Sequence, residues 1–304
     1  MEAYVISHNY LMSQAPQKIR KAVLPAAGFG TRLLPATKSL PKELLPIVDT
    51  PVLQFLVEEA VEAGVTEVIF VINTGKEAIW NHFAPHKILE QMLAEKGKQE
   101  DLARLRKIHE MARFSYVLQP EPLGDGHAIL QAQELVGDEP FLVLFGDDIV
   151  VGEPGVASQL AAVHARTGGA VVALTEVPKE RVSSYGVVQP GTCIDNEVTI
   201  IGFVEKPKPA DAPSNLAIVG KYICPPSIFP ILAKNLNGSG EIRLIDALAE
   251  LQKTEPVTGL LFEGKRYDTG DKAGYVQAII DFAIRHSEIG EATKAHLKKI
   301  VQDF

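Results

Sequence analysis

After a short apolar run, Ala22-Val23-Leu24, the chain reads Gly-Phe-Gly-Thr-Arg-Leu-Leu-Pro-Ala-Thr over Gly28–Thr37 and Pro-Lys-Glu-Leu-Leu-Pro over Pro41–Pro46. The apolar run is typical of a buried strand, so the glycine loop follows the carboxyl end of that strand, where open α/β sheets bind nucleotides. Gly28 and Gly30 allow backbone N–H groups to approach phosphate oxygens closely, and Arg32 and Lys42 add fixed positive charge. The stretch therefore predicts a polyphosphate site on an α/β fold, in preference to a plain glycine turn beside surface cations.

The spacing excludes two common phosphate loops. A dinucleotide fingerprint, G-x-G-x-x-G, requires a third glycine at a position that holds Leu33. A Walker A loop, G-x-x-x-x-G-K-[ST], has its nearest candidate at Gly75-Lys76. Phe70 and Glu77 stand there at the positions that require glycine and serine or threonine. The glycine loop belongs to neither class.

The first half of the chain alternates short apolar runs with helical patterns, which predicts an α/β fold. The expected strands are Lys21–Leu24, Glu67–Ile72, Phe114–Leu118, Phe141–Phe145 and Ala170–Glu176. The expected helices are Val52–Ala63 and Asp125–Val136, each followed by a glycine that favours a left-handed cap. The charged, helical stretch Pro85–Arg113 is expected to pack outside the sheet as an insertion and a subunit contact.

Beyond Glu176 the apolar runs become shorter, at 186–189, 198–205 and 216–223, and predict a smaller mixed sheet, with a proline-rich loop at 207–213. Later helices are expected at Pro226–Ala233, Leu244–Gln252, Asp271–His286 and Ile289–Gln302. We expect an N-terminal arm, 1–18, then one domain, 19–287, and a C-terminal helix, 288–304. The domain has a nucleotide lobe at about 19–176 and a second lobe at about 177–270.

In combination, these motifs resemble the sugar-nucleotide pyrophosphorylases, nucleotidyltransferases that act on sugar 1-phosphates. The pattern G-x-G-T-R-x-x-P-x-T…P-K is followed in family order by Val204-Glu205-Lys206-Pro207 and by Asn-Leu-Ala-Ile-Val-Gly-Lys-Tyr over Asn215–Tyr222. The resemblance runs from about Lys21 to about His286. It implies a Rossmann-like sheet, mixed but mostly parallel, flanked by helices and extended by a smaller sugar-binding β lobe.

The resemblance also implies a set of nucleotide-binding residues. They are Ala26, Ala27, Gly28, Gly30, Thr31, Glu43, Gln119 and Gly124. The amide of Gln119 offers both a donor and acceptors, which suits a uracil edge.

The turn Gly124-Asp125-Gly126-His127-Ala128 departs from the resembled family, which carries an aliphatic residue in place of Asp125. Aspartate is a favoured N-cap residue, so Asp125 is expected to cap the helix that starts here. His127 is expected to order the loop rather than to act as a base.

A sugar phosphate site is implied at Glu205 and Lys206. Adjacent residues on a strand point to opposite faces, but a bend before Pro207 would let both side chains reach one ligand. Glu205 would accept hydrogen bonds from sugar hydroxyls and Lys206 would pair with the phosphate, while Gly186 and Ile218 line the pocket. The alternative from sequence alone is an exposed pair of neighbouring charges.

Two acidic sites suggest a metal. Asp147 and Asp148 follow the apolar run Phe141–Phe145, and Asp268 stands in Tyr267-Asp268-Thr269-Gly270. Magnesium typically takes one or two carboxylates plus substrate phosphates. The resemblance implies that Asp147 and Asp268 hold Mg²⁺ and that Asp148 points elsewhere; the alternative is that these aspartates only cap turns.

The reaction implied by the resemblance is Mg²⁺-assisted nucleotidyl transfer from UTP to α-D-glucose 1-phosphate, with UDP-glucose and pyrophosphate as products. Arg32, Lys42 and Lys206 are its expected catalytic residues. A phosphate monoester with a second pKa near ~6 is already largely a dianion, so no general base is required. The same reaction with dTTP or another sugar 1-phosphate is the first alternative, and a non-catalytic nucleotide-sugar-binding subunit is the second.

Composition is that of a globular protein, with 46% hydrophobic and 22% charged residues among 304. The net charge of −8 argues against nucleic acid or an anionic membrane as a partner. Cys193 and Cys224 are isolated in the sequence, which favours a reducing cytoplasm. The resemblance implies a homodimer or homotetramer.

Overall fold

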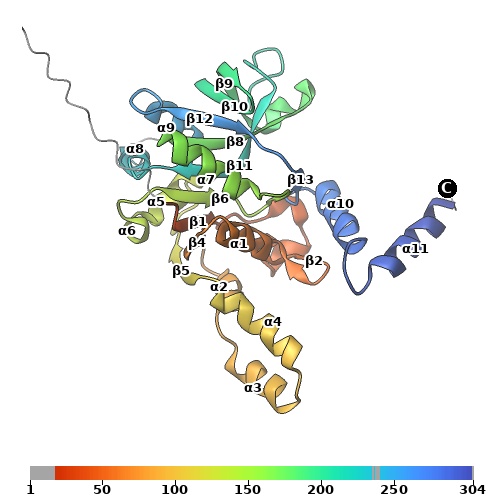
Figure 1. Ribbon diagram of the computed structural model, residues 1–304. Coiled ribbons are helices and arrows are strands. Elements are labelled where there is room, and N and C mark those ends of the chain that lie inside the picture. Colours follow the sequence, from red (N-terminus) through yellow and green to blue (C-terminus); the bar gives the residue numbers. More distant parts are fainter. Residues whose placement is uncertain (1–17, 235, 237–239, 303–304) are drawn as a thin grey trace, which may run out of the picture.

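A nine-stranded sheet forms the centre of the computed structural model, which describes residues 18–234, 236 and 240–302 (Figure 1). Its order is β5-β4-β1-β6-β11-β8-β12-β10-β9. The strands are β1 Lys21–Pro25, β4 Glu67–Ile72, β5 Arg113–Leu118, β6 Phe141–Leu144, β8 Ala170–Glu176, β9 Gly186–Ile194, β10 Glu197–Glu205, β11 Leu216–Cys224 and β12 Val257–Leu261. Within this sheet, β10 and β11 run antiparallel to all their neighbours, while the pairs β5–β4, β4–β1, β1–β6 and β8–β12 are parallel.

Alternating side chains bury both faces of the sheet, as the period of two in a strand requires. On β1, Val23 belongs to one apolar cluster, whereas Ala22 and Leu24 belong to the other. The first cluster is completed by α5 Asp125–Gln131, α6 Gln133–Val136, α8 Ile228–Lys234 and α9 Leu244–Leu251. The second is completed by α1 Val52–Glu62, α2 Glu77–Phe83 and α7 Val156–Thr167. The result is a three-layer arrangement with the sheet in the middle.

The predicted mixed α/β sheet with flanking helices is confirmed, and the strands expected from Lys21 to Glu176 are present within a residue at their ends. The later strands extend the same sheet, because β12 joins β8 to β10; they do not form a separate smaller sheet. The expected single helix from Asp125 is two helices, α5 and α6, separated at Ala132.

Two short strand pairs lie outside the large sheet. β2 (Pro46–Ile47) pairs with β3 (Thr50–Pro51), and β7 (Asp148–Val151) pairs antiparallel with β13 (Lys265–Asp268). The second pair sets Asp268 opposite Asp148. Residues separated by 120 positions along the chain are thus brought together directly after β6.

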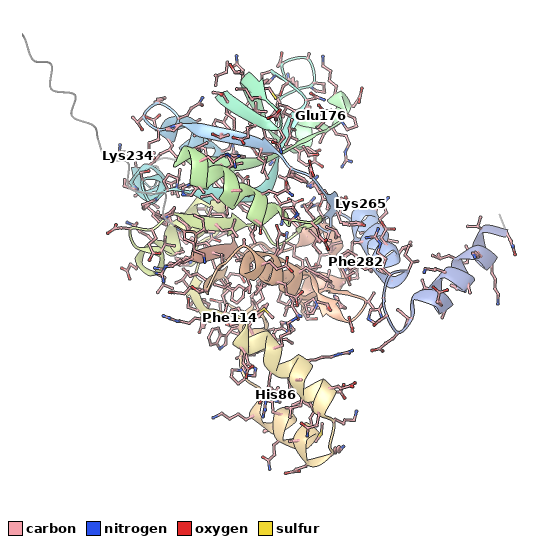
Figure 2. The ribbon with its side chains drawn as sticks, in the orientation of Figure 1. His86, Phe114, Glu176, Lys234, Lys265 and Phe282 are labelled. Atoms are coloured by element: carbon pink, nitrogen blue, oxygen red, sulfur yellow. The ribbon has the colours of Figure 1, made fainter. Side chains whose placement is uncertain are left out.

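Pro85–Arg113 contains a hairpin of α3 (Lys87–Glu95) and α4 (Gln99–Glu110), which projects from the body of the molecule as the insertion expected from sequence (Figure 1). His86, at the start of this hairpin, is labelled in Figure 2. At the other end of the chain, α10 (Lys272–Ala283) packs beside β13 and α11 (Gly290–Gln302) extends away from the sheet. In the described part of the chain, none of the helices has the length and apolar composition that crossing a lipid bilayer requires.

Candidate active site

The glycine loop after β1 is held by its carbonyl groups. The carbonyl of Ala26 accepts a hydrogen bond from Nζ of Lys76 (2.6 Å), and that of Ala27 accepts one from Nδ2 of Asn73 (2.8 Å). The backbone N–H groups of residues 27–30 donate to no partner within the described residues. Gly30 has a left-handed φ of 65°, which a side chain would strain. The loop thus presents free amide donors to an anion.

Glu43 lies under this loop in a buried ion pair. Its two carboxylate oxygens are 3.1 and 2.8 Å from Nζ of Lys76, and only 1% of Glu43 is exposed. Burial raises the pKa of Glu43 and lowers that of Lys76, although each charge favours the other. Because both oxygens of Glu43 already bind Lys76, this residue supports the floor of the site as well as lining it.

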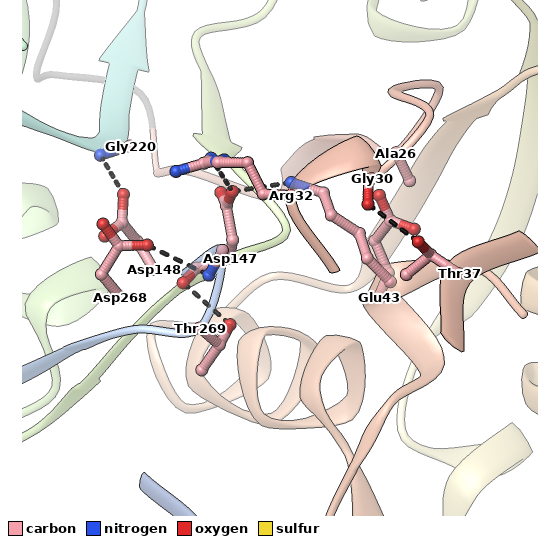
Figure 3. A network of polar contacts seen from close by, with 12 residues as sticks. Ala26, Gly30, Arg32, Thr37, Glu43, Asp147, Asp148, Gly220, Asp268 and Thr269 are labelled. Atoms are coloured by element: carbon pink, nitrogen blue, oxygen red, sulfur yellow. Dashed lines mark hydrogen bonds and ion pairs between the residues drawn. The ribbon is translucent and has the colours of Figure 1, made fainter. Parts of the chain in front are cut away.

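Asp147 is the centre of a cluster of charges directly after β6 (Figure 3). Its Oδ2 is 2.6 Å from Nζ of Lys42 and 3.6 Å from Nη2 of Arg32. Burial alone would raise the pKa of Asp147, but Lys42 and Arg32 outweigh it and lower the pKa. Burial likewise disfavours the ammonium of Lys42, yet Asp147 and Glu43 raise its pKa. Asp147 and Lys42 are therefore both charged at neutral pH.

Asp268 faces the same point as Asp147. A methyl group built on Gly270 would lie 2.5 Å from Oδ2 of Asp147, 2.9 Å from Nη2 of Arg32 and 3.1 Å from Oδ1 of Asp268. Thr269 fixes this arrangement, because its N–H and hydroxyl both donate to the carbonyl of Asp147 (2.8 and 2.9 Å). The absence of a side chain at Gly270 leaves a small cradle between two carboxylates.

Asp148 has a different partner. Its Oδ1 accepts from Nε of Arg266 at 2.6 Å and its Oδ2 accepts from the N–H of Gly220 at 3.0 Å. The prediction that Asp148 points elsewhere is thus confirmed. Within the described residues, no set of three or more acidic, histidine or cysteine side chains is arranged to hold a metal. Two carboxylates and substrate phosphates would suit magnesium.

The loop after β5 is ordered by His127. Its Nδ1 lies 3.0 Å from the carbonyl of Glu121 and 3.1 Å from Nε2 of Gln119, and its Nε2 lies 3.0 Å from Gln131. Gln119 also donates from Nε2 to the carbonyl of Gly124 (3.0 Å). His127 is therefore a structural residue, as predicted, and the oxygen of the Gln119 amide is the atom available to a ligand.

Asp125 does not cap its own helix as predicted: Gly124 precedes α5, and no side chain caps that end. The Oδ1 atom of Asp125 accepts instead from the N–H of Gly126 (2.7 Å) and from the N–H of Leu244 (2.9 Å), the first residue of α9. The sequence could not indicate this, because α9 lies 119 positions further along the chain.

The strand pair β9–β10 sets Glu205 opposite Gly186, and β9 reaches β11 through Val187 and Ala217. A side chain at Gly186 would collide with Cδ1 of Ile245 at 2.6 Å and approach Oε2 of Glu205 to 3.2 Å. Lys206 adopts a left-handed φ of 45°, and its Nζ lies 3.1 Å from Oε1 of Glu205. The bend expected before Pro207 is present, and both side chains face one space.

Two adjoining cavities result. The loop cavity, of about 270 Å³, lies at the glycine loop and includes the predicted residues Ala27, Gly28, Lys42, Glu43, Gln119 and Gly124. The strand cavity, of about 340 Å³, includes Arg32, Gly186, Glu205, Lys206 and Ile218. Both are lined by the same four residues: Asp125, Phe145, Asp147 and Glu241.

Ala26, Gly30, Thr31 and Asp268 do not line either cavity. A larger cavity, of about 760 Å³ between the α3–α4 hairpin and α10, contains none of the predicted site residues.

The sequence patterns did not indicate several residues of the site. Arg243 and Tyr222 line the strand cavity, and Asn73, Lys76 and Arg266 support the site from behind. Lys76 was visible only as part of a failed Walker A match, and none of the others stands in a recognisable spacing.

Gly270→Ala is expected to lower turnover by roughly 10²-fold, since a displacement of about 1 Å in a reacting group has that effect. The added methyl group would displace the ends of the Asp147 and Arg32 side chains and leave the backbone in place, so the unfolding midpoint should hardly change. Steady-state kinetics and thermal unfolding measure both. Gly155→Ala, whose methyl group meets nothing nearer than 3.4 Å, is the matched control. Wild-type turnover by Gly270→Ala would show that the cradle at Gly270 is not needed for the reaction.

Free loop amides bind anions, and two facing carboxylates suit a divalent ion shared with phosphates, so the cleft is built to hold two phosphate-bearing molecules side by side. The chain belongs to the nucleotidyl transferase family, whose model matches residues 21–283. Use of a divalent metal is general in that family.

Among its relatives, the UTP–glucose-1-phosphate uridylyltransferase of Bacillus subtilis is 45% identical over 274 residues, which are 90% of this chain and 94% of that protein. The enzyme of the same name from Staphylococcus epidermidis is 44% identical over 285 residues, 93% of this chain and 99% of the relative.

The solved structures that this chain resembles belong to proteins of the same kind as these relatives. The UTP-bound UDP-glucose pyrophosphorylase of Acinetobacter baumannii has a TM-score of 0.86 at 38% identity, covering 92% of this chain and 98% of that one. A UDP-glucose pyrophosphorylase complexed with UDP-glucose has a TM-score of 0.80 at 39% identity, covering 88% and 100%. The resemblance to sugar-nucleotide pyrophosphorylases is thereby confirmed.

Proposed function

We propose that this protein transfers the uridylyl group of UTP to α-D-glucose 1-phosphate and releases pyrophosphate. The observation that carries the proposal is the pair of cavities that meet at Asp147, one at the glycine loop and one at Glu205 and Lys206. The relatives at 44–45% identity carry the name of this activity, and relatives with known structures hold UTP or UDP-glucose.

UTP occupies the loop cavity in this proposal. Its phosphates accept hydrogen bonds from the free amides of residues 27–30 and pair with Arg32 and Lys42. The Gln119 amide oxygen accepts from the N3–H group of uracil, since its nitrogen is already bound to Gly124. Arg32 is suited to this role, because 64% of its side chain is exposed and its ion pair with Asp147 is long, at 3.6 Å.

Glucose 1-phosphate occupies the strand cavity. Glu205 accepts hydrogen bonds from sugar hydroxyls, Lys206 pairs with the phosphate, and Gly186 and Ile218 allow the sugar ring to lie against the strands. The left-handed backbone at Lys206 turns the chain before Pro207, so that Lys206 and Glu205 line the same cavity.

A divalent ion, magnesium, completes the site. Asp147 and Asp268 would hold it at the cradle left by Gly270. When bound, it supplies positive charge that neutralises phosphate oxygens.

The protein's own contribution to the reaction is to position and neutralise two anions. A phosphate oxygen of glucose 1-phosphate attacks the α-phosphorus of UTP in line, and the bond from that phosphorus to the bridging oxygen of the leaving pyrophosphate breaks. Because the attacking phosphate is already largely a dianion, no side chain needs to take a proton. Lys206 orients the attacking group, and Arg32 and Lys42 stabilise the charge on pyrophosphate.

Pyrophosphate release with UTP and glucose 1-phosphate, in the presence of Mg²⁺ and of a chelator, tests the proposal. We expect rapid release that chelation abolishes. A panel of triphosphates and sugar 1-phosphates separates UTP from dTTP and glucose 1-phosphate from other sugars. No release with any pair would favour the non-catalytic alternative.

Glu205→Ala is expected to raise KM for glucose 1-phosphate by about 10- to 100-fold, since hydrogen bonds to charged groups contribute about 1.5–3 kcal/mol. KM for UTP should change little, because Glu205 does not line the loop cavity. Glu197→Ala, at the other end of β10 in a surface ion pair with Arg166, is the control. An unchanged KM for glucose 1-phosphate would exclude Glu205 from the sugar site.

A homo-oligomer in the cytoplasm is part of the proposal. The apolar residues Ile289, Ile300 and Val301, at and beside α11, are exposed on a helix that extends from the body of the molecule, and a second copy would cover them. Light scattering should give a dimer or tetramer for the full chain and a monomer after truncation at residue 288. A monomeric full chain would contradict this. Two free cysteines, one of them exposed, fit the reducing cytoplasm.

A further inference from the structure

Asp125 lies where the two cavities meet, on a tightly fixed loop. Residues 123–126 are joined to residues 241–244 by backbone hydrogen bonds from Gly126 to Ile242 (2.9 Å) and from Ile242 to Leu123 (2.7 Å). A side chain at Gly124 would meet the carbonyl oxygen of Ile242 at 2.3 Å, and one at Gly126 would meet Leu232 of α8 at 2.7 Å and the same carbonyl oxygen at 3.0 Å. The backbone of Asp125 is therefore held in place by the residues before and after it.

Only one oxygen of the Asp125 carboxylate is engaged. Oδ1 accepts from the N–H groups of Gly126 and Leu244, whereas Oδ2 has no hydrogen-bond donor among the described residues. Asp125 is exposed in the cleft and lines both cavities. Oδ2 is thus the oxygen that a ligand can reach.

Asp125 also differs in charge balance from every other carboxylate that lines the cavities. Glu43 pairs with Lys76, Asp147 with Lys42, Asp148 with Arg266, Glu205 with Lys206 and Glu241 with Arg243. Asp125 has no cationic side chain within ion-pair distance among the described residues. It contributes an uncompensated negative charge to the cleft.

Asp125 shares the wall of the strand cavity with Glu205, the residue proposed to bind the sugar hydroxyls. Although Asp125 is exposed to the cleft, the surrounding protein removes part of its hydration and raises its pKa, and the negative charges of Glu205 and Glu241 raise it further. Glu205 lines the strand cavity but not the loop cavity. A carboxylate on the sugar, in addition to its phosphate, would therefore be repelled by Asp125 and Glu205. A sugar hydroxyl would instead find a hydrogen-bond acceptor in Oδ2 of Asp125.

We propose that Asp125 determines specificity for the sugar: Oδ2 accepts a hydrogen bond from a hydroxyl of a neutral sugar 1-phosphate, and the carboxylate excludes sugar 1-phosphates that carry a carboxylate of their own. This inference rests on the proposed function and names the substrate class of the strand cavity. Like charges placed together in an interface discriminate strongly against the wrong partner.

Asp125→Asn tests the proposal, because asparagine keeps an oxygen for the N–H groups of Gly126 and Leu244 and removes the charge. The measured quantity is the ratio of kcat/KM for glucose 1-phosphate to that for glucuronic acid 1-phosphate, with UTP fixed. We expect the ratio to fall by at least about tenfold, which corresponds to about 1.4 kcal/mol. If Asn destabilises the fold in thermal unfolding, Asp125→Ser serves the same purpose.

Glu241→Gln is the matched control, since Glu241 also lines both cavities but is paired with Arg243. Its ratio should change much less than that of Asp125→Asn. An equal change in both variants, an unchanged ratio in Asp125→Asn, or a change confined to UTP against its 2′-deoxy analogue would overturn the proposal. Failure of the wild type to use any sugar 1-phosphate would instead overturn the proposed function.

Discussion

Asp147→Asn is expected to lower kcat for uridylyl transfer by roughly 10²–10³-fold, the size of effect that follows the loss of one transition-state interaction, because the divalent ion that would neutralise phosphate charge would be held less well. The substitution keeps the shape of the side chain, but it removes a negative charge from the cradle at Gly270 and leaves Lys42 without its partner at 2.6 Å. The concentration of Mg²⁺ needed for half-maximal rate should rise as well. Steady-state rates over a magnesium titration measure both effects.

The same variant has a predicted effect on stability. Lys42 and Arg32 lower the pKa of Asp147 below its ordinary value in spite of burial. A lowered pKa in the folded state stabilises the protein above the pKa of the unfolded carboxyl, and this contribution is lost only as the pH falls through the folded value. At neutral pH, Asp147→Asn should therefore unfold at a lower temperature than the wild type.

Asp148→Asn is the control for the metal. Asp148 is adjacent in sequence but binds Arg266 and Gly220. Its replacement should affect stability and leave the magnesium requirement unchanged. If Asp147→Asn kept the wild-type rate and magnesium dependence, Asp147 would not belong to the metal site.

Arg32→Ala is expected to lower kcat by about 10³-fold or more, since arginines that stabilise phosphoryl transfer are worth about 10³–10⁵ in rate. The free energy of unfolding should change little, because the side chain is 64% exposed and its ion pair with Asp147 spans 3.6 Å. The variant should therefore show a large fall in kcat and almost no change in the thermal unfolding midpoint.

Two further variants make this result specific. Arg32→Lys keeps the charge without the planar fork of donors, so it should recover part of the rate. Arg104→Ala removes an equally exposed arginine, paired with Glu288 far from the cleft, and should behave as the wild type. Near wild-type turnover by Arg32→Ala would remove Arg32 from the catalytic role.

The sequence was most informative where local chemistry decides the structure. The apolar run at Ala22–Leu24 became β1, and the glycine loop followed its carboxyl end, because strand burial and glycine backbone freedom are properties of short segments. The bend that brings Glu205 and Lys206 to one space was indicated by Pro207 for the same reason.

Contacts between segments that are far apart along the chain could not be predicted from the sequence. Asp268 gave only a weak signal, since its place beside Asp147 depends on the four-residue pairing of β13 with β7. Asp125 was assigned to its own helix because its partner, the start of α9, lies far along the chain. Asn73 and Lys76 hold the glycine loop through backbone carbonyls, an interaction that no residue pattern records.

The separate smaller sheet expected for the second half has a related explanation. Shorter apolar runs indicate shorter strands, but they do not state which neighbour each strand pairs with. β12 pairs parallel with β8 and antiparallel with β10, and so joins both halves in one sheet.

In the proposed reaction, the diphosphate bridge forms between the glycine loop and Lys206, beside Asp147. A crystal structure of this protein with UDP-glucose tests it most directly. We predict the diphosphate within hydrogen-bond distance of the amides of residues 27–30, with uracil at Gln119 and glucose at Glu205. Density for UDP-glucose in the cavity between the α3–α4 hairpin and α10, with the glycine loop free of phosphate, would contradict the claim.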